Sequence, residues 1–181
     1  MDPARLVRVS KLLSFALRHD PAAVGLSLDD AGWASVDDVL AALGRRGEAV
    51  SRAELAELVR ASDKQRFALA PDGTRIRANQ GHSVAVDLGL PARPPPPVLY
   101  HGTVARFLEG IRASGLLRGE RTHVHLSAEE GTAVAVARRR GAPIVLVVDA
   151  VAMHDTGHVF HVSENGVWLT EHVPPRYLRF P

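Results

Sequence analysis

The sequence predicts an α+β protein made of two lobes. Three observations lead to this prediction. The first half combines helically spaced apolar residues with a hairpin signal, a run of prolines interrupts the chain over residues 91–97, and strand-like and helix-like segments alternate after it. With 181 residues, 46% hydrophobic and 23% charged, the chain can form two small cores. We expect a first lobe over residues 1–92 and a second over residues 93–181, with the stiff proline run at the boundary.

The first lobe shows the spacing of three helices. Residues 4–19 are predicted to form the first helix, because apolar residues recur there at helical spacing: Leu6, Val9, Leu12, Leu13, Ala16 and Leu17. A second helix is predicted to begin at Ser35 and to stop at Gly44. A third begins at Ser51, because Glu54 stands three residues later as the partner of a capping box.

A hairpin follows the three helices. Residues 66–69 and 74–77 have the composition of short strands, and Pro71, Asp72 and Gly73 between them form a turn signal. Three helices followed by a hairpin is the order of a winged helix. That fold contacts nucleic acid in some proteins and other proteins elsewhere.

The second lobe alternates between strands and helices. The predicted strands cover residues 98–100, 124–126, 144–148, 159–162, 167–170 and 177–180. Helices are predicted over residues 104–113 and 128–140. This half is therefore expected to be a compact α+β lobe.

The net charge of the chain is small, and most of its histidines lie in the second lobe. The formal net charge is only +2, from 22 Lys and Arg against 20 Asp and Glu, so a polyanion would need a local cluster of cations. Seven of the nine histidines belong to the second lobe, which makes that lobe the place to look for chemistry. They are His101, His123, His125, His154, His158, His161 and His172.

Several classes of protein are excluded or disfavoured. Cysteine is absent, which excludes disulfides, cysteine-bound zinc, iron–sulfur clusters and thiol nucleophiles. Neither GxGxxG nor a P-loop motif occurs, so a bound nucleotide would not use a Rossmann or P-loop site. Without a signal segment or an apolar stretch of about 18 residues, we expect a cytoplasmic protein with no membrane partner. A monomer is the default expectation.

Two groups in the second lobe offer ligand-binding atoms. His101, Gly102 and Thr103 follow a predicted strand, where they would either bind a sugar or amide or form a turn capped by Thr103. His123 and His125 point to the same face of a strand. A zinc pair is conceivable, but no third ligand stands at a suitable spacing, so we predict no metal and favour a histidine pair that faces a sugar or phosphate.

Two groups in the first lobe could bind a polyanion. Arg18 and His19 end the first helix, where cations either complement the helix dipole or clamp a phosphate. Residues 77–83 form a polar loop that is rich in hydrogen-bond donors. Residues 138–140, three arginines at another helix end, are interpreted as a solvated cap.

Seven segments together resemble the RNA 2′-phosphotransferase family, also called the tRNA 2′-phosphotransferases. They occur in the family's order: SKLLSFALRH (10–19), GW (32–33), DKQRF (63–67), RANQGHS (77–83), LYHGT (99–103), RTHVHLS (121–127) and SENGVWLT (163–170). The resemblance implies a winged-helix-like lobe followed by a lobe related to ADP-ribosyltransferases. It also implies NAD⁺ as co-substrate and, as partner, an RNA whose 2′-phosphate remains after splicing.

The resemblance also implies roles for individual residues. The catalytic tetrad would be Arg18, His19, Arg66 and Arg121, with Arg118 as the alternative to Arg121. The residues expected to hold NAD⁺ are His101, Gly102, Thr103, His125, Ser127, Gly166 and Val167. Val167 would stand where ADP-ribosyltransferases often carry a glutamate. The residues expected to contact RNA are Lys64, Arg77, Asn79, Gln80, His82 and Ser83.

The implied reaction has two steps. The RNA 2′-phosphate first attacks the anomeric carbon of the nicotinamide ribose and releases nicotinamide. The ribose 2″-hydroxyl then attacks phosphorus, which frees the RNA and forms ADP-ribose 1″,2″-cyclic phosphate. Two alternatives stay open: an ADP-ribosyltransferase that stops after the first step on nucleic-acid phosphate ends or protein, and a non-enzymatic winged-helix regulator with a ligand-sensing lobe.

Overall fold

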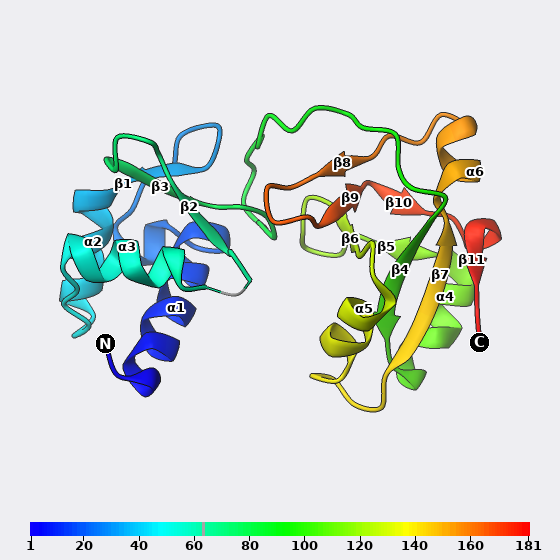
Figure 1. Ribbon diagram of the computed structural model, residues 1–181, viewed down its shortest axis with the longest axis horizontal. Helices are drawn as coiled ribbons and strands as arrows, with labels where there is room; N and C mark the ends of the chain where they lie inside the picture. The colour runs from blue at the N-terminus through cyan, green and yellow to red at the C-terminus, as the bar shows by residue number, and fades with distance from the viewer. Residues whose placement is uncertain (63) are drawn as a thin grey trace. The chain divides into compact units, whose positions relative to one another are not determined.

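Six α-helices and eleven short strands are present in the computed structural model, which describes residues 1–62 and 64–181 (Figure 1). Asp63, the first residue of the segment DKQRF, lies outside the described residues. The chain divides into a first unit, Met1–Gly89, and a second unit, Leu90–Pro181. Each unit has its own hydrophobic core.

The helices of the first unit begin where the sequence predicts. They are α1 (Pro3–Arg18), α2 (Val36–Arg45) and α3 (Arg52–Arg60), with a short 3₁₀ turn, η1, over Ala22–Val24. The Ser35 hydroxyl accepts a hydrogen bond from the backbone N–H of Asp38, which caps α2. Ser51 and Glu54 form the predicted capping box of α3. Helix α2 continues one residue beyond Gly44.

The three strands of the first unit form one antiparallel sheet in the order β1-β3-β2. Strands β2 (Phe67–Leu69) and β3 (Arg75–Ala78) are the predicted hairpin, with Gly73 at φ 70° in the turn. Strand β1 (Trp33–Ser35) was not predicted. With only three residues it has no pattern of its own, and its pairing with β3 defines it.

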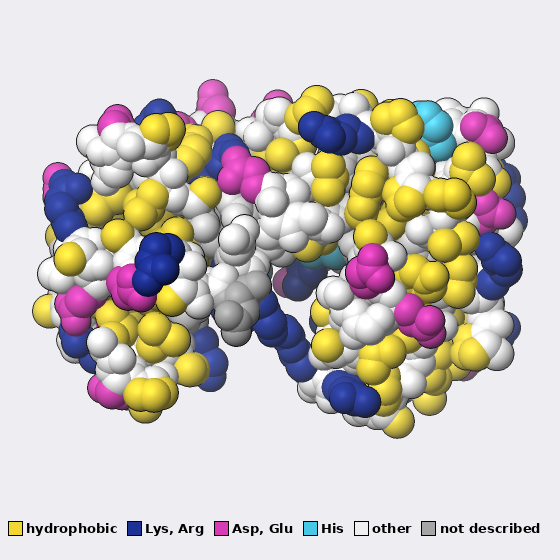
Figure 2. Space-filling model, viewed as in Figure 1, with side chains coloured by type: hydrophobic (Ala, Val, Ile, Leu, Met, Phe, Trp, Pro, Cys, Tyr) yellow, Lys and Arg dark blue, Asp and Glu magenta, His cyan; other side chains and the backbone are white. Residues whose placement is uncertain are grey.

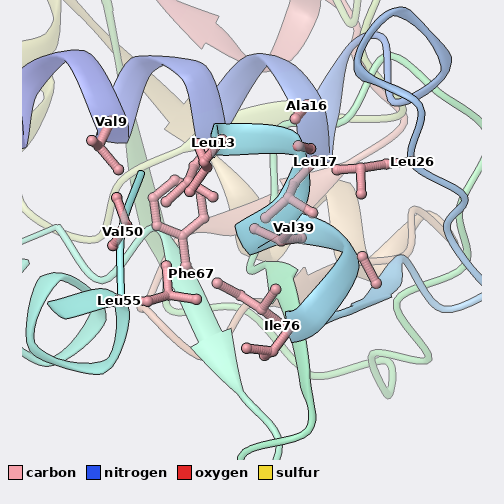
Figure 3. Close-up of a cluster of buried hydrophobic side chains, with 14 of the residues drawn as sticks. Val9, Leu13, Ala16, Leu17, Leu26, Val39, Val50, Leu55, Phe67 and Ile76 are labelled. Carbon is pink, nitrogen blue, oxygen red and sulfur yellow. The ribbon is translucent and has the colours of Figure 1, made fainter. Parts of the chain in front are cut away.

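The core of the first unit joins α1, α2, α3 and the sheet. Figure 3 shows Leu13, Leu17, Phe67 and Ile76 turned toward one another, and each is at most 3% exposed. Burying each such side chain contributes about 1.5–3 kcal/mol to the free energy of unfolding. Leu6 shares the helical spacing of Leu13 and Leu17, but it is 38% exposed and is not part of the core.

The second unit contains three small antiparallel sheets. Their strand orders are β11-β7-β4, β6-β9-β8 and β10-β5. The strands are β4 (Val98–Thr103), β5 (Leu116–Leu117), β6 (Val124–Leu126), β7 (Ile144–Asp149), β8 (His161–Val162), β9 (Trp168–Thr170), β10 (His172–Val173) and β11 (Leu178–Arg179). An isolated bridge between Tyr100 and Ser127 connects β4 with the residue that follows β6.

The helices of the second unit are shorter than predicted. The helix expected over residues 104–113 is a 3₁₀ turn, η2 (Ala105–Phe107), followed by α4 (Leu108–Ser114). Helix α5 (Glu130–Ala137) replaces the one expected over residues 128–140, because the backbone is still extended at Glu129. Helix α6 (Ala150–Asp155) was not predicted, and η3 (Pro175–Tyr177) is a further 3₁₀ turn.

The proline-rich segment lies along the second unit. The backbone of Ala92 bridges to His161, and the N–H of Arg93 donates to the carbonyl of Phe160. At the other end of the segment, the carbonyl of Pro97 accepts hydrogen bonds from the first residues of α6. These bonds hold the segment to the start of α6 and to β8.

The charged side chains on the surface reflect the small net charge of the chain. Figure 2 shows acidic and basic side chains interspersed on the visible face of each unit. In the part of the chain that the structure describes, no helix is both long and apolar enough to cross a bilayer.

Candidate active site

The C-terminal end of α1 presents Arg18 and His19 beside the polar loop of residues 77–83. The carbonyl of Arg18 accepts a hydrogen bond from the N–H of Ser83 at 2.8 Å. The Ser83 hydroxyl lies 2.9 Å from His19 Nδ1. The loop therefore supplies a donor to the helix end and a hydroxyl that orients the His19 ring.

Arg66 is held against the same helix end through its backbone. Its carbonyl accepts hydrogen bonds from Arg18 Nη2 at 3.4 Å and from the N–H of Asn79 at 2.9 Å. The Arg18 guanidinium also lies 5.8 Å from the centre of the Phe67 ring. The structure thus brings together three members of the predicted tetrad, namely Arg18, His19 and Arg66.

The residue before Arg66 has an unusual backbone. Gln65 has φ 38°, and it is the one non-glycine residue with positive φ among the residues described. Such a conformation costs about 1–3 kcal/mol and persists only where neighbouring contacts fix it. Here the Asn79 side chain donates to the carbonyl of Gln65 at 2.6 Å. Strain of this kind next to a candidate residue is typical of functional sites.

The six residues expected to contact RNA differ in their exposure to solvent. Lys64 and Ser83 are exposed, and Arg77 and Gln80 are half-buried. Asn79 and His82 are buried, at 6% and 0% exposure. In this conformation Asn79 supports the backbone around Arg66 instead of facing solvent.

His82 is fully buried, within reach of the charges of three cationic side chains. Among residues 1–62 and 64–181, neither of its ring nitrogens has a hydrogen-bond partner. Burial lowers the pKa of His82 to about 4, and the charges of Arg18, Arg77 and His19 act in the same direction. His82 is therefore neutral at physiological pH.

Arg77 is positioned by an aromatic ring. Its guanidinium lies 4.6 Å from the centre of the Trp33 ring, on the neighbouring strand β1. Trp33, which belongs to the segment GW, thus contributes a cation–π contact that orients Arg77.

In the second unit, His101, Arg121 and His125 form a hydrogen-bonded group. His101 Nδ1 donates to the carbonyl of His125 at 3.1 Å, so the proton of His101 is on Nδ1. Arg121 Nη1 donates to His125 Nδ1 at 2.8 Å, because a guanidinium can only donate, so the proton of His125 is on Nε2. His101 Nε2 is therefore an acceptor, and the ring proton of His125 is carried by Nε2.

The pKa values of this group depend on burial and on a second arginine, Arg140. Burial lowers the pKa of His101, the hydrogen bond to His125 opposes this, and the charges of Arg140 and Arg121 lower the pKa further. Desolvation lowers the pKa of Arg121, and Arg140 again adds to it. Residues 138–140 are exposed directly after α5, as a solvated cap would be, and the charge of Arg140 also acts on this group.

Gly102 is required by packing. A methyl group at this position would overlap the backbone carbonyl of Ala133 in α5. His101, Gly102 and Thr103 also continue β4, since they pair with β7 as far as Ile144. The expectation that they form a turn after the strand is therefore wrong.

The remaining residues expected to hold NAD⁺ lie near the sheet ends. Thr103 is buried, whereas Ser127 is half-buried and exchanges two backbone hydrogen bonds with Tyr100. Gly166, at φ 77°, forms a turn whose N–H donates to the carbonyl of Ser163. Val167 is half-buried, and its N–H donates to the Ser163 hydroxyl at 3.1 Å. Tyr100 and Ser127 join the segments LYHGT and RTHVHLS, which bring His101 and His125 together.

Most of the other histidines have structural contacts. The ring of His123 stands edge-on to that of His161 at 5.8 Å, and His161 Nδ1 donates to the carbonyl of Leu90. His172 donates to the carbonyl of Ser114, and the His158 ring packs against Tyr177. In the described part of the chain, no three His, Asp or Glu side chains are grouped as metal ligands would be.

These two groups define the class of protein. Clustered arginine and histidine side chains at a helix end suit a phosphate, and the histidine pair of the second unit suits a hydroxyl-bearing ligand. Such a donor set is typical of an enzyme that handles phosphorylated substrates.

Comparison with known proteins identifies the family. The model of the RNA 2′-phosphotransferase, Tpt1 / KptA family matches residues 4–172. A probable RNA 2′-phosphotransferase of Streptomyces coelicolor is 58% identical over 100% of this chain and 98% of its own length. The probable RNA 2′-phosphotransferase of Pseudomonas aeruginosa strain UCBPP-PA14 is 54% identical over 99% of this chain and 99% of its own length. That of Rhodopirellula baltica is 51% identical over 98% of this chain and 97% of its own length. The chain belongs to the RNA 2′-phosphotransferase family, as the seven segments predict.

Proposed function

We propose that this chain transfers an internal 2′-phosphate of RNA to NAD⁺ and releases nicotinamide and ADP-ribose 1″,2″-cyclic phosphate. The observation that carries the proposal is the convergence of Arg18, His19 and Arg66 at the end of α1, in a member of this family. Arg121 of the second unit is proposed as the fourth catalytic residue.

The residue types suit a phosphate that reacts twice. A phosphate monoester is already anionic near neutral pH, because its second pKa is about 6, so the first nucleophile needs orientation more than a general base. Arginine forks supply that orientation. Charge then builds on the phosphoryl oxygens in the second step, where the same guanidinium groups stabilise it.

The second unit has groups that fit a nucleotide ribose. His101 Nε2 can accept a hydrogen bond from a sugar hydroxyl, and His125 Nε2 can donate one to a sugar oxygen. His101 stays neutral because burial lowers its pKa, so its acceptor persists at physiological pH. NAD⁺ would supply an electrophilic anomeric carbon with nicotinamide as the leaving group.

In each proposed step one bond forms while another breaks. In the first, a 2′-phosphate oxygen forms a bond to the anomeric carbon while the bond to nicotinamide breaks, giving ADP-ribosylated RNA. In the second, the ribose 2″-oxygen forms a bond to phosphorus while the bond to the RNA 2′-oxygen breaks. The 2″-hydroxyl loses a proton and the RNA 2′-oxygen gains one. His19, oriented by Ser83, is the candidate for that transfer.

A carboxylate is dispensable in this scheme. Val167 is proposed to occupy the position at which ADP-ribosyltransferases often carry a glutamate. Glu164, three residues earlier, is exposed in the described structure. Because the phosphate brings its own negative charge to the reacting carbon, an apolar residue at this position is compatible with the first step.

Arg121 is favoured over Arg118 as the tetrad member. Arg121 donates to His125 and lies close enough to His101 to affect its pKa. The charge of Arg118 acts instead on His123, whose pKa it lowers after burial and His161. This difference supports Arg121 as the fourth residue.

The finer description of the fold is also part of the proposal. Three helices followed by the β2–β3 hairpin support a winged-helix-like first lobe. The small antiparallel sheets of the second unit, with the bridge from Tyr100 to Ser127, are compatible with an ADP-ribosyltransferase-like lobe.

Incubation with NAD⁺ and a 2′-phosphorylated oligonucleotide, followed by mass analysis, tests the function. We expect dephosphorylated RNA together with the cyclic phosphate product. A stable ADP-ribose adduct as the end product would instead favour the ADP-ribosyltransferase. Absence of turnover, with the protein folded, would favour a ligand-sensing regulator.

A further inference from the structure

Helix α1 has a second apolar face that the core does not use. Its inner face buries Leu13 and Leu17 completely. On the outer face, Val7 and Phe15 are 49% and 40% exposed, and Leu6, nearer the start of the helix, is 38% exposed. Single exposed apolar side chains are ordinary, but several along one helix form a patch that favours a ligand.

This outer face borders a groove that also reaches the proposed phosphate site. Six side chains define the α1 groove, together with two serine hydroxyls: Leu6, Val7, Lys11, Phe15, His19 and Arg66. Its volume is about 370 Å³. That is within the range of about 300–1,000 Å³ in which small-molecule sites fall.

The charged side chains of the α1 groove are all basic. Helix α1 contains no Asp or Glu between Pro3 and Arg18, and none of the acidic residues that the structure describes lines the groove. Arg8, further back on the helix, is paired with Glu48 at 2.6 Å. Lys11 forms no ion pair with any of the described residues. The groove thus combines an aromatic face with an uncompensated cation.

We propose that the α1 groove binds a nucleoside that neighbours the 2′-phosphate in single-stranded RNA, with its base against Phe15 and its backbone phosphate beside Lys11. The inference rests on the proposed function, because His19 and Arg66 belong to both sites. Stacking on aromatic rings with cations along the backbone is how single-stranded nucleic acid is commonly bound. A ligand anchored at His19 and Arg66 by its phosphate places its neighbouring nucleoside along α1.

Equilibrium binding without NAD⁺ tests this site. The probes are a labelled 2′-phosphorylated RNA oligonucleotide and a nucleoside 2′-phosphate, which has no neighbouring nucleoside. We expect Phe15→Ala to raise the Kd of the oligonucleotide about tenfold, the loss typical of one stacked base. The Kd of the nucleoside 2′-phosphate should change much less. The matched control is Phe107→Ala, since Phe107 is 41% exposed in the second unit.

Salt dependence tests the role of Lys11. Removing one phosphate contact to a single strand lowers the slope of log Kd against log salt by about 0.7. We expect this reduction for Lys11→Ala with the oligonucleotide, and recovery of the slope for Lys11→Arg. An unchanged slope in Lys11→Ala would overturn the assignment of Lys11.

Three outcomes would overturn the proposal. They are equal losses in Phe15→Ala and Phe107→Ala, equal losses for both probes, and no binding of the oligonucleotide by the unaltered chain. If Phe15→Ala does not fold, as judged by circular dichroism, Phe15→Leu replaces it, because leucine keeps the apolar bulk and removes the stacking face. Because NAD⁺ is absent, groove binding without turnover in the separate assay would contradict only the proposed function.

Discussion

His82 makes the stability of the first unit depend on pH. Its folded pKa is about 4, well below the unfolded value of about 6.5, because the ring is buried beside Arg18, Arg77 and His19. Between these values the unfolded chain binds a proton that the folded chain does not, so stability falls as pH falls. We expect His82 to remove about 3 kcal/mol from the free energy of unfolding between pH 6.5 and 4.

Denaturant titrations at several pH values measure this effect. Fluorescence of Trp33 reports the first unit if Trp168 is replaced by Phe in both proteins. In that background His82→Leu should show a flatter dependence on pH within the window, whatever its stability at neutral pH. Parallel curves with and without the His82→Leu substitution would show that another group carries the pH dependence.

Arg66 and Arg121 should matter most in the second chemical step. Negative charge is concentrated on the phosphoryl oxygens there, and replacing either guanidinium by Ala removes a positive partner. We expect both variants to lose the second step by at least about a hundredfold, with a smaller loss in the first. ADP-ribosylated RNA should therefore accumulate. Single-turnover mass analysis measures both steps, and equal losses in the two would argue against this division.

At the scale of elements, Gly102 determines how closely α5 packs on β4. A side chain at this position would overlap the carbonyl of Ala133, so Gly102→Ala must push the helix away from the strand. Such overpacking against a backbone is expected to cost about 3 kcal/mol or more. It should also disturb His101, the neighbouring residue. Thermal unfolding measures the loss of stability.

Gly131 in α5 provides the matched control. Nothing lies within 4 Å of a methyl group added there. Gly131→Ala should leave stability unchanged or raise it by up to about 1 kcal/mol, since alanine is the better helix former. A comparable loss in both variants would mean that α5 tolerates no change, and the close contact at Gly102 would not explain the result.

Elements with local signals could be predicted, and elements defined by distant partners could not. Ser35 and Ser51 mark their helices because a capping hydroxyl acts within three residues. Strands β1, β5 and β10 are two or three residues long and exist only through their pairing. Strand β4 runs through Thr103 for the same reason, because β7 supplies partners beyond Tyr100.

The candidate site follows the same rule. Arg18, His19 and Arg66 could be proposed from the family resemblance, and their proximity agrees with it. The contribution of Arg140 could not be foreseen, because it depends on where the chain turns after α5. The α1 groove was missed because Leu6 has the spacing of a core residue. Its only sequence signal was the absence of acidic residues along α1.

At the scale of the whole molecule, two separate cores predict two folding units. The buried residues of the first unit, including Leu13, Phe67 and Ile76, pack against one another within residues 9–78. A domain of this size can stabilise itself, since chains of about 60 residues already do so in many proteins. We therefore expect a fragment of residues 1–89 to fold alone and to unfold cooperatively.

Urea unfolding of the fragment tests this expectation, with Trp33 as its single tryptophan. Its m value should be smaller than that of the full chain, because m scales with the surface exposed on unfolding. Leu13→Ala should lower the stability of the fragment by about 2–5 kcal/mol, the usual cost of a cavity at a fully buried leucine. A fragment without a cooperative transition would show that the first core depends on residues of the second unit. The His82 and α1 groove variants would then have to be interpreted only in the full chain.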